Sequence, residues 1–269
     1  MSVSGAPTAG PVRPVRSFHV DLLEVRVYPD RIALGAAAAS DCAAAIRGIL
    51  AARPRCRMVF AAAPSQNEVL AGLRDAEGID WPRVEAFHMD EYEGLPPGDP
   101  RRFGEFLRAA LFSRVPLGRV EYLAPGAGSG NPDREADRYA ALLSEAPIDL
   151  VCLGVGENGH IAFNDPGVAD FRDPRTVKEA ELDSACRAQQ VHDGCFASLD
   201  EVPRRALTLT VPALLSGGRL FCSVPGPTKA EAVRRMLSGP VSPDCPASAL
   251  RNHPACVLYL DAESAGALP

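Results

Sequence analysis

The alternation of strand-like and helix-like segments along this 269-residue chain is the feature that most limits its fold. Short apolar runs, typical of buried strands, lie between longer stretches of helical periodicity. The expected strands are 22–28, 57–62, 84–89, 120–123, 148–153, 219–224 and 255–260, and the expected helices are 31–52, 67–76, 103–111, 133–146 and 228–237. Because parallel strands are joined through helices, the pattern predicts an α/β, Rossmann-like domain whose mostly parallel sheet carries helices on both faces.

Composition along the chain indicates one domain. Residues 1–17, MSVSGAPTAGPVRPVRS, are rich in Pro, Gly and Ser and lack the apolar core of a secretory signal, so we expect a disordered leader. Residues 18–269 show no composition break and no internal repeat, which predicts a single domain. The segment 164–206 has a weak pattern, and we expect it to form a lid or a wall over a site.

Charge and cysteine usage limit the partners. The net charge of −6 argues against a nucleic-acid partner, and the apolar runs are shorter than the ~20 residues that a membrane helix needs. Eight cysteines are scattered without a C-x-x-C motif, and two of them lie inside apolar strand-like runs. Buried, reduced thiols and a cytoplasmic location are therefore expected. Any anionic ligand must be met by a local cluster of donors.

Three expected strands end in polar sequence. Strand 57–62 runs into Ala63-Pro64-Ser65-Gln66-Asn67, strand 84–89 into Asp90-Glu91-Tyr92, and strand 148–153 into GVGENGHIAFNDP. In parallel sheets, ligands bind at the carboxyl ends of strands. We therefore expect these three loops to converge on one crevice.

The residues 154–159, GVGENG, fit the G-x-G-x-x-G pattern of dinucleotide-binding loops. Such a loop requires a helix that starts within it, usually after the first strand, whereas Pro166 interrupts a helix here and the loop follows about the fifth strand. The glycines instead favour a tight turn that holds His160 beside Asn158, Asn164 and Asp165. That set suits general acid–base chemistry, and a purely structural histidine is the alternative.

The stretch EAFHMDEYEGLP places Asp90 and Glu91 at the carboxyl end of a strand. A carboxylate there could remove a proton from a carbon next to a carbonyl, and a plain polar loop is the alternative. His88, Asp90 and His160 would also be acceptable metal ligands. Adjacent side chains on a strand point to opposite faces and no recognised ligand spacing is present, so no metal is expected.

Together these two loops resemble glucosamine-6-phosphate deaminases, also called isomerases. That family carries M-D-E-Y-x-G-L and, further along the chain, L-G-x-G-x-[DN]-G-H-I-[AG]-F-N-E-P. Residues 89–95, MDEYEGL, and 153–166, LGVGENGHIAFNDP, match in order and separation. The stretches ALTLTVPALL and VPGPTKAEAV extend the resemblance over about 20–260.

The resemblance implies a reaction and roles for its residues. The family opens the pyranose ring of glucosamine 6-phosphate or a close epimer, moves a proton from C2 to C1, and releases ammonia to leave a ketose phosphate, with no metal or organic cofactor. Asp90 is implied as the base at C2, and His160 as the shuttle for the ring-opening proton, oriented by Asn158 and Asp165. Asn158 stands where some members have Asp, and Asp165 replaces the usual Glu.

The resemblance also implies a phosphate site, in which this chain departs from the family. The usual G-x-P-T-G-x-T-like loop reads AAAPSQN here and leaves Ser65, Gln66 and Asn67 as donors. His192 falls near the phosphate-gripping Arg of the family, with Arg187 close by in sequence to compensate. Lys229 matches the family's lysine.

Other functions stay open on the sequence. A 6-phosphogluconolactonase-like hydrolase carries L-G-x-G-x-D-G-H-x-A-S-L-F-P, and HIAFNDP with the MDEY turn favours the deaminase over it. A different aldose–ketose phosphate activity and a non-catalytic sugar-phosphate-binding relative are further alternatives, and a homo-oligomer is open too. The chain ends nine residues after the last expected strand, and allosteric hexameric members have a longer C-terminal segment. The resemblance therefore predicts a protein without that regulation.

Overall fold

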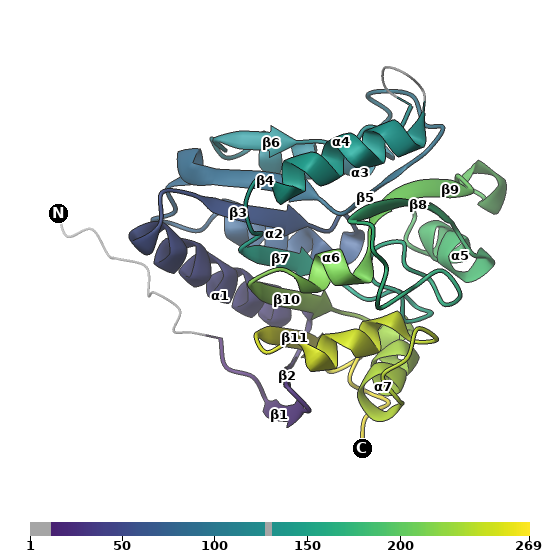
Figure 1. Ribbon diagram of the computed structural model, residues 1–269. Coiled ribbons are helices and arrows are strands. Elements are labelled where there is room, and N and C mark those ends of the chain that lie inside the picture. The colour runs from purple at the N-terminus through teal and green to yellow at the C-terminus, as the bar shows by residue number, and fades with distance from the viewer. Residues whose placement is uncertain (1–11, 127–130) are drawn as a thin grey trace.

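A computed structural model describes residues 12–126 and 131–269 (Figure 1). Its main sheet has eight strands in the order β1-β2-β11-β10-β7-β3-β4-β6, and every pair except β1–β2 is parallel. This confirms the predicted mostly parallel α/β sheet. The strands are β1 (Arg16–Val20), β2 (Leu23–Tyr28), β3 (Cys56–Phe60), β4 (Val84–His88), β6 (Arg119–Glu121), β7 (Leu150–Leu153), β10 (Arg219–Val224) and β11 (Cys256–Asp261).

A second, three-stranded antiparallel sheet extends from the end of β4. Its order is β5-β9-β8, and none of the three strands was expected. They are β5 (Asp90–Tyr92), β8 (Val177–Glu181) and β9 (Arg205–Leu209). β5 has only three residues and β8 reads VKEAE, so neither carries an apolar strand signal. Only Met89 separates β4 from β5, and the small sheet therefore begins at the carboxyl end of a central strand of the large one.

Helices cover both faces of the main sheet, as predicted. The α-helices are α1 (Arg31–Ala52), α2 (Asn67–Arg74), α3 (Phe103–Leu107), α4 (Pro132–Ser144), α5 (Ser184–His192), α6 (Val211–Leu215) and α7 (Ala230–Ser238). One hydrophobic core lies under α1, α2 and α3, and a second lies under α4, α6 and α7. Alternate side chains of each strand enter opposite cores; Met58 belongs to the first and Val59 to the second. α5 and α6 were not expected.

Helix α1 has the bounds that its periodicity predicts. Oδ1 of Asp30 accepts a hydrogen bond from the backbone N–H of Ala33 at 2.8 Å and caps its first turn. By length and composition α1 could also cross a membrane, contrary to the expectation from the lengths of the apolar runs. Leu34, Ile46 and Leu50 are nevertheless buried against the sheet, so its apolar residues serve packing within the domain.

The predicted leader, residues 1–17, and the weakly patterned segment 164–206 have different outcomes in the structure. Residues 1–11 of the predicted leader lie outside the described residues, but Arg16 and Ser17 already pair with β2, so the leader boundary at residue 17 is wrong. The segment 164–206 folds into β8, α5 and the start of β9. Gln189 and Gln190 of α5 line a cavity, which confirms that this segment forms a wall.

Candidate active site

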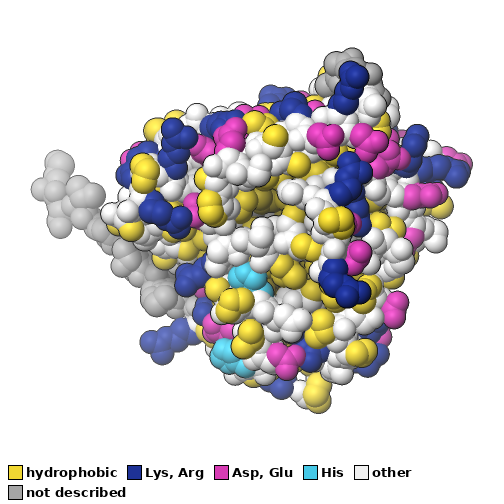
Figure 2. Space-filling view, viewed as in Figure 1, with side chains coloured by type: hydrophobic (Ala, Val, Ile, Leu, Met, Phe, Trp, Pro, Cys, Tyr) yellow, Lys and Arg dark blue, Asp and Glu magenta, His cyan; other side chains and the backbone are white. Residues whose placement is uncertain are grey.

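A cavity opens where β3, β4 and β7 end. Ser65, Gln66, Asp90 and His160 all line it, so the predicted convergence of the three loops is confirmed. Figure 2 shows the face of the molecule that carries α4, α6 and α7, which is hollowed between apolar side chains. The cavity is lined by Ala61, Ala62, Ala63, Ser65, Gln66, Met89, Asp90, Phe103, Gly154, Val155, Gly156, His160, Ala162, Phe163, Gln189 and Gln190.

Asp90 is the first residue of β5, where its backbone pairs with Thr208 of β9. Its side chain lines the cavity although the residue is only 6% exposed. Burial raises the pKa of this carboxyl well above its usual value, and the nearby charge of Glu91 raises it further. A carboxylate whose pKa is raised accepts a proton more readily, as a general base requires.

Glu91, the second acid of the turn, serves the fold. Its carboxylate accepts hydrogen bonds from the backbone N–H groups of Tyr92, Phe103 and Gly104 at 3.0, 3.1 and 3.0 Å. Two of these donors belong to the first turn of α3, where a negative charge is favourable. The Nε of Arg102 lies 3.4 Å from the same carboxylate. Glu91 therefore anchors α3 beside the cavity and, unlike Asp90, does not line it.

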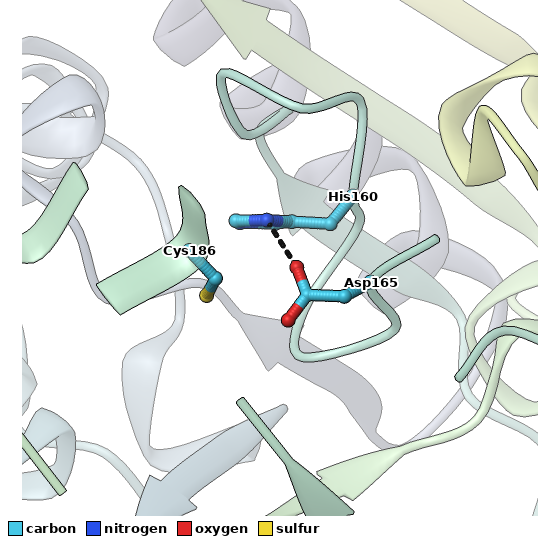
Figure 3. A group of neighbouring side chains, drawn as sticks. All are labelled: His160, Asp165 and Cys186. Carbon is cyan, nitrogen blue, oxygen red and sulfur yellow. Dashed lines mark ion pairs between the residues drawn. The ribbon is translucent and has the colours of Figure 1, made fainter. Parts of the chain in front are cut away.

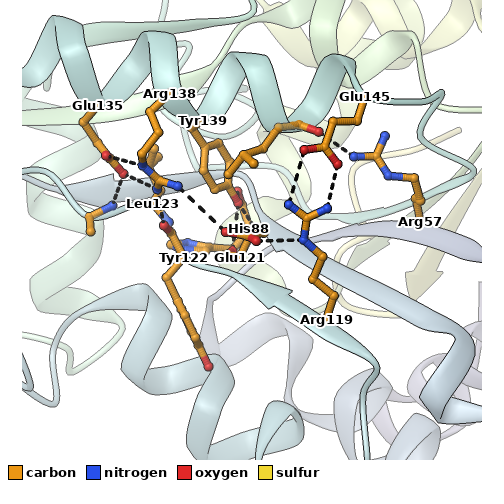
Figure 4. A network of polar contacts seen from close by, with 12 residues as sticks. Arg57, His88, Arg119, Glu121, Tyr122, Leu123, Glu135, Arg138, Tyr139 and Glu145 are labelled. Carbon is orange, nitrogen blue, oxygen red and sulfur yellow. Dashed lines mark hydrogen bonds and ion pairs between the residues drawn. The ribbon is translucent and has the colours of Figure 1, made fainter.

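His88 is also structural: both of its ring nitrogens are engaged in hydrogen bonds, so it is not available as the metal ligand that the sequence left as an alternative. Its Nε2 accepts the N–H of Leu123 at 2.9 Å, so Nδ1 carries the proton and donates to the backbone oxygen of Asp90, also at 2.9 Å. Figure 4 shows the ring inside a polar network with Tyr139, whose hydroxyl bonds the backbone of His88. Burial lowers the pKa of His88 to about 4, so this ring is neutral near pH 7.

The glycines of the 154–159 loop give the backbone the freedom that the sequence predicted. The ring of His160 packs directly on Gly156, where a Cβ atom would lie only 2.2 Å from the ring. Gly159 has a φ of +90°, a conformation that L side chains rarely adopt. The N–H of Gly156 donates to the backbone oxygen of His160 at 2.9 Å and closes the turn. The loop thus places an imidazole at the rim of the sheet.

Asp165 faces the ring of His160. Its Oδ1 lies 2.8 Å from Nδ1 of His160, and Asp165 is fully buried. In Figure 3 the ring is seen edge-on and the carboxylate lies to one side of its plane. Within the described residues, Nδ1 accordingly has no hydrogen bond of normal geometry. Burial raises the pKa of Asp165, but the neighbouring imidazole of His160 and the amide of Asn158 outweigh it and lower the pKa overall.

Asn158 orders this carboxylate. Its Nδ2 donates to Oδ1 of Asp165 at 2.9 Å and to Oδ2 of Asp183 at 3.1 Å, and its Oδ1 accepts the N–H of His160 at 3.0 Å. Asp183, the N-cap of α5, was not foreseen as a neighbour, although the sequence DSAC carries a capping signal. Asn164 is buried, and its amide donates to two backbone oxygens, which makes it a structural residue of the loop.

The predicted phosphate-binding residues are only partly brought together. Ser65 and Gln66 line the cavity, and Nε2 of Gln66 donates to the backbone oxygen of Ser223 at 3.2 Å and to Oγ of Ser65 at 3.3 Å. Asn67 is exposed at the start of α2. The side chain of His192 is 63% exposed, and its Nδ1 lies 3.4 Å from Glu157. Neither Asn67 nor His192 lines the cavity.

Lys229, the cation of the predicted phosphate site, is buried but does not line the cavity. It is only 5% exposed, and its Nζ makes no hydrogen bond within the part of the chain that the structure describes. Burial lowers its pKa, while the charges of Asp193 and Glu157 act in the opposite direction. Arg187 cannot compensate for the missing family arginine in this arrangement, because its guanidinium donates to the backbone oxygens of Leu199 and Val202.

Gln189 and Gln190 are cavity residues that were not predicted from the sequence. Oε1 of Gln189 accepts the N–H of Glu157 at 2.8 Å and ties α5 to the glycine loop. Both lie on α5, whose sequence SACRAQQVH gives little helical periodicity. The N-cap signal of Asp183 was the only cue to this helix.

Comparisons with known proteins agree with this geometry. Residues 29–258 match the model of the family described as glucosamine-6-phosphate isomerases/6-phosphogluconolactonase. The chain is 34% identical over 190 residues to a glucosamine-6-phosphate deaminase of Exiguobacterium sibiricum, covering 71% of this chain and 73% of the relative. It is 31% identical over 253 residues to that of Rhodopirellula baltica, covering 93% and 97%.

Two solved structures show the same fold. A monomeric glucosamine-6-phosphate deaminase superposes with a TM-score of 0.81 at 28% identity, covering 90% of this chain and 99% of that one. A 6-phosphogluconolactonase from Shewanella baltica gives a TM-score of 0.72 at 18% identity, covering 88% and 97%, and at that identity the likeness concerns the fold alone. The family match spans most of the chain and includes both loops of the cavity. This chain therefore belongs to the glucosamine-6-phosphate isomerase/6-phosphogluconolactonase family.

Proposed function

We propose that this protein is a deaminating isomerase that converts glucosamine 6-phosphate, or a close epimer, to the ketose 6-phosphate and ammonia. The observation that carries the proposal is that Asp90 and the His160–Asp165 pair line or adjoin one cavity. One carboxylate with a raised pKa and one imidazole backed by a second carboxylate suit the two proton transfers of this reaction.

Ring opening is the first step. The O5–C1 bond of the pyranose breaks when the C1 hydroxyl loses a proton and O5 gains one, and His160 is the group that can carry that proton. Asp165 stabilises the imidazolium that forms, because its carboxylate lies 2.8 Å from Nδ1. Asn158 holds the carboxylate by a hydrogen bond of 2.9 Å.

The C2 proton is removed next. The aldehyde freed at C1 acidifies the C–H bond at C2, and Asp90 takes that proton to give an enolamine. Protonation at C1 then gives an imine at C2, and water adds to the imine to release ammonia and leave the ketose. No metal or organic cofactor is needed for these steps, because the carbonyl of the substrate supplies the electron sink.

Lys229 is our proposed phosphate ligand, supported by the hydroxyl of Ser65 and the cavity amide of Gln66. A buried ammonium without a partner is costly, and an anionic ligand would offset that cost. His192, in its exposed position beside Glu157, would join only after a change of rotamer. The eight free thiols suit the reducing cytoplasm, where we expect the enzyme to act.

Product analysis tests the proposal. Wild-type protein is incubated with glucosamine 6-phosphate, and the ammonia and fructose 6-phosphate formed are measured. The two products should appear in equal amounts. Asp90→Asn should reduce the rate by about 10²–10⁴-fold, because the amide cannot accept the C2 proton. Hydrolysis of 6-phosphogluconolactone without ammonia release would favour the lactonase alternative, and binding of the sugar phosphate without turnover would favour a non-catalytic relative.

A further inference from the structure

A buried set of three potential metal ligands lies behind the ring of His160. The side chains of His160, Asp165 and Cys186 each offer one ligand atom, and these atoms lie within 4.8 Å of one another. In Figure 3 the carboxylate of Asp165 and the sulfur of Cys186 lie on the same side of the imidazole. This set does not include His88, which had been considered as a ligand and set aside on the sequence.

Cys186 reaches this place through the start of α5. Asp183 caps the helix, and its Oδ1 accepts the N–H of Cys186 at 2.6 Å. The thiol therefore occupies the first turn of a helix, while burial and the charges of Asp165 and Asp183 raise its pKa well above the usual value, so a metal ion would have to displace its proton. Cys186 is 1% exposed, and the reaction proposed above does not use it.

The unpaired nitrogen of His160 is the second observation that points to a ligand. Nδ1 is buried without a hydrogen bond inside the described structure, although a carboxylate oxygen lies 2.8 Å away. The residue is only 8% exposed, but its ring lines the cavity, which gives an entry path. A turn of the ring about its Cβ–Cγ bond would aim the Nδ1 lone pair at the side where Asp165 and Cys186 lie.

We propose that His160, Asp165 and Cys186 bind a thiophilic divalent cation, zinc foremost, and that this binding inhibits the enzyme. Imidazole, carboxylate and thiolate are three ligands that zinc accepts, and the cavity leaves its fourth position open. Magnesium and calcium prefer oxygen ligands alone, so the thiol selects against them. Binding displaces the thiol proton and occupies the imidazole that would carry the ring-opening proton. The inhibition rests on the proposed function, whereas the binding does not.

Binding is tested first, without reference to turnover. Cobalt(II) is titrated into metal-free protein, and the sulfur-to-cobalt charge-transfer absorption is recorded. Wild-type protein and Asp90→Asn should both give the band, so a failure of the proposed reaction leaves this test intact. The band should disappear in Cys186→Ser and in Cys186→Ala. The alanine variant keeps the test valid if the serine variant does not fold. Cys195→Ser is the matched control, since Cys195 is a half-buried thiol of the same segment, and it should keep the band.

Inhibition is tested by titrating zinc into the ammonia-release assay, with fructose 6-phosphate read after quenching with EDTA. We expect the zinc concentration for half-inhibition to rise at least about tenfold in both Cys186 variants and to stay unchanged in Cys195→Ser. Magnesium should not inhibit, and EDTA should restore activity. The proposal is overturned if wild-type protein shows no thiolate band, if the Cys186 variants respond to zinc like wild type, or if magnesium inhibits equally.

Discussion

Nδ2 of Asn158 donates a 2.9 Å hydrogen bond to Oδ1 of Asp165, the same oxygen that lies 2.8 Å from the ring of His160. The same amide also reaches Asp183, so one neutral side chain separates two carboxylates. An aspartate at this position, as in some members of the family, could not donate to either of them. In this chain the amide is therefore a structural requirement of the Asp165–Asp183 pair.

The substitution Asn158→Asp tests that requirement. It removes both donors and places three carboxylates together, so we expect the free energy of unfolding at pH 7 to fall by about 1–3 kcal/mol. The new carboxyl has a raised pKa in the folded state, and the loss should therefore shrink as the pH falls and the carboxyl is protonated. Urea denaturation at pH 7 and pH 5 measures both effects. Asn67→Asp, at an exposed position, is the control and should leave the free energy of unfolding unchanged.

His160→Gln tests the ring-opening role. The amide cannot shuttle the proton, so turnover of the cyclic substrate should fall by at least about 100-fold. An open-chain analogue bypasses that step, and its turnover should fall by less than about tenfold. Steady-state rates on both substrates give the comparison. Equal losses on the two would mean that His160 acts elsewhere in the reaction.

The raised pKa of Asp90 predicts an acid limb in the rate profile. The base must be ionised, so kcat/KM should decline as the pH falls through a pKa that lies above the usual value for an aspartate. Burial is the main cause of the shift, and therefore the limb should persist at high salt, which screens exposed charges much more than buried ones. A pH–rate profile at low and high salt checks this. An acid limb at the ordinary aspartate pKa would contradict the assignment.

The substitution Lys229→Met should weaken binding of the phosphorylated sugar and at the same time stabilise the fold. A charge-assisted hydrogen bond to phosphate is lost, so KM for the phosphorylated sugar should rise by about 10–100-fold with little change in kcat. Removal of a buried, unpaired ammonium should at the same time raise the free energy of unfolding by roughly 1 kcal/mol.

The only other lysine of the chain provides the matched control. Lys178 lies 2.9 Å from Asp173 and also donates to the backbone oxygen of Val168. Lys178→Met breaks this pair, so it should lower stability and leave KM unchanged. If both variants changed KM alike, Lys229 would not be a specific phosphate ligand.

His88 predicts a pH dependence of stability. Its pKa is lowered by burial to about 4, whereas an unfolded histidine titrates near 6.5. Between these values the unfolded chain binds the extra proton, so stability falls as the pH drops from 6.5 to 4, by about 3 kcal/mol from this group. Thermal or urea unfolding across that range measures it. His88→Gln should flatten this part of the dependence, and His19→Gln, at an exposed residue, should retain it.

The main sheet could be predicted closely from sequence. Each expected strand lies within two residues of an observed one at both ends, and α1 matches at both ends. Apolar runs of strand length and long periodic helices are local signals, since burial of a whole strand or of one helix face is recorded in consecutive residues. The convergence of Ser65, Asp90 and His160 on one cavity could also be predicted from the sequence, because parallel strands bring their carboxyl ends to one edge of the sheet.

The parallel sheet, the two polar loops that meet at the cavity and the family that they resemble could all be inferred from the sequence. The tertiary structure alone decided which polar side chains meet. It tied His88 to Leu123 and Asp90, turned His192 outward toward Glu157, and brought Asp183 and Cys186 of α5 behind His160. The physical reason is that β5, β8 and α5 are short and held by long-range pairing and caps, which leave no periodic pattern in the chain.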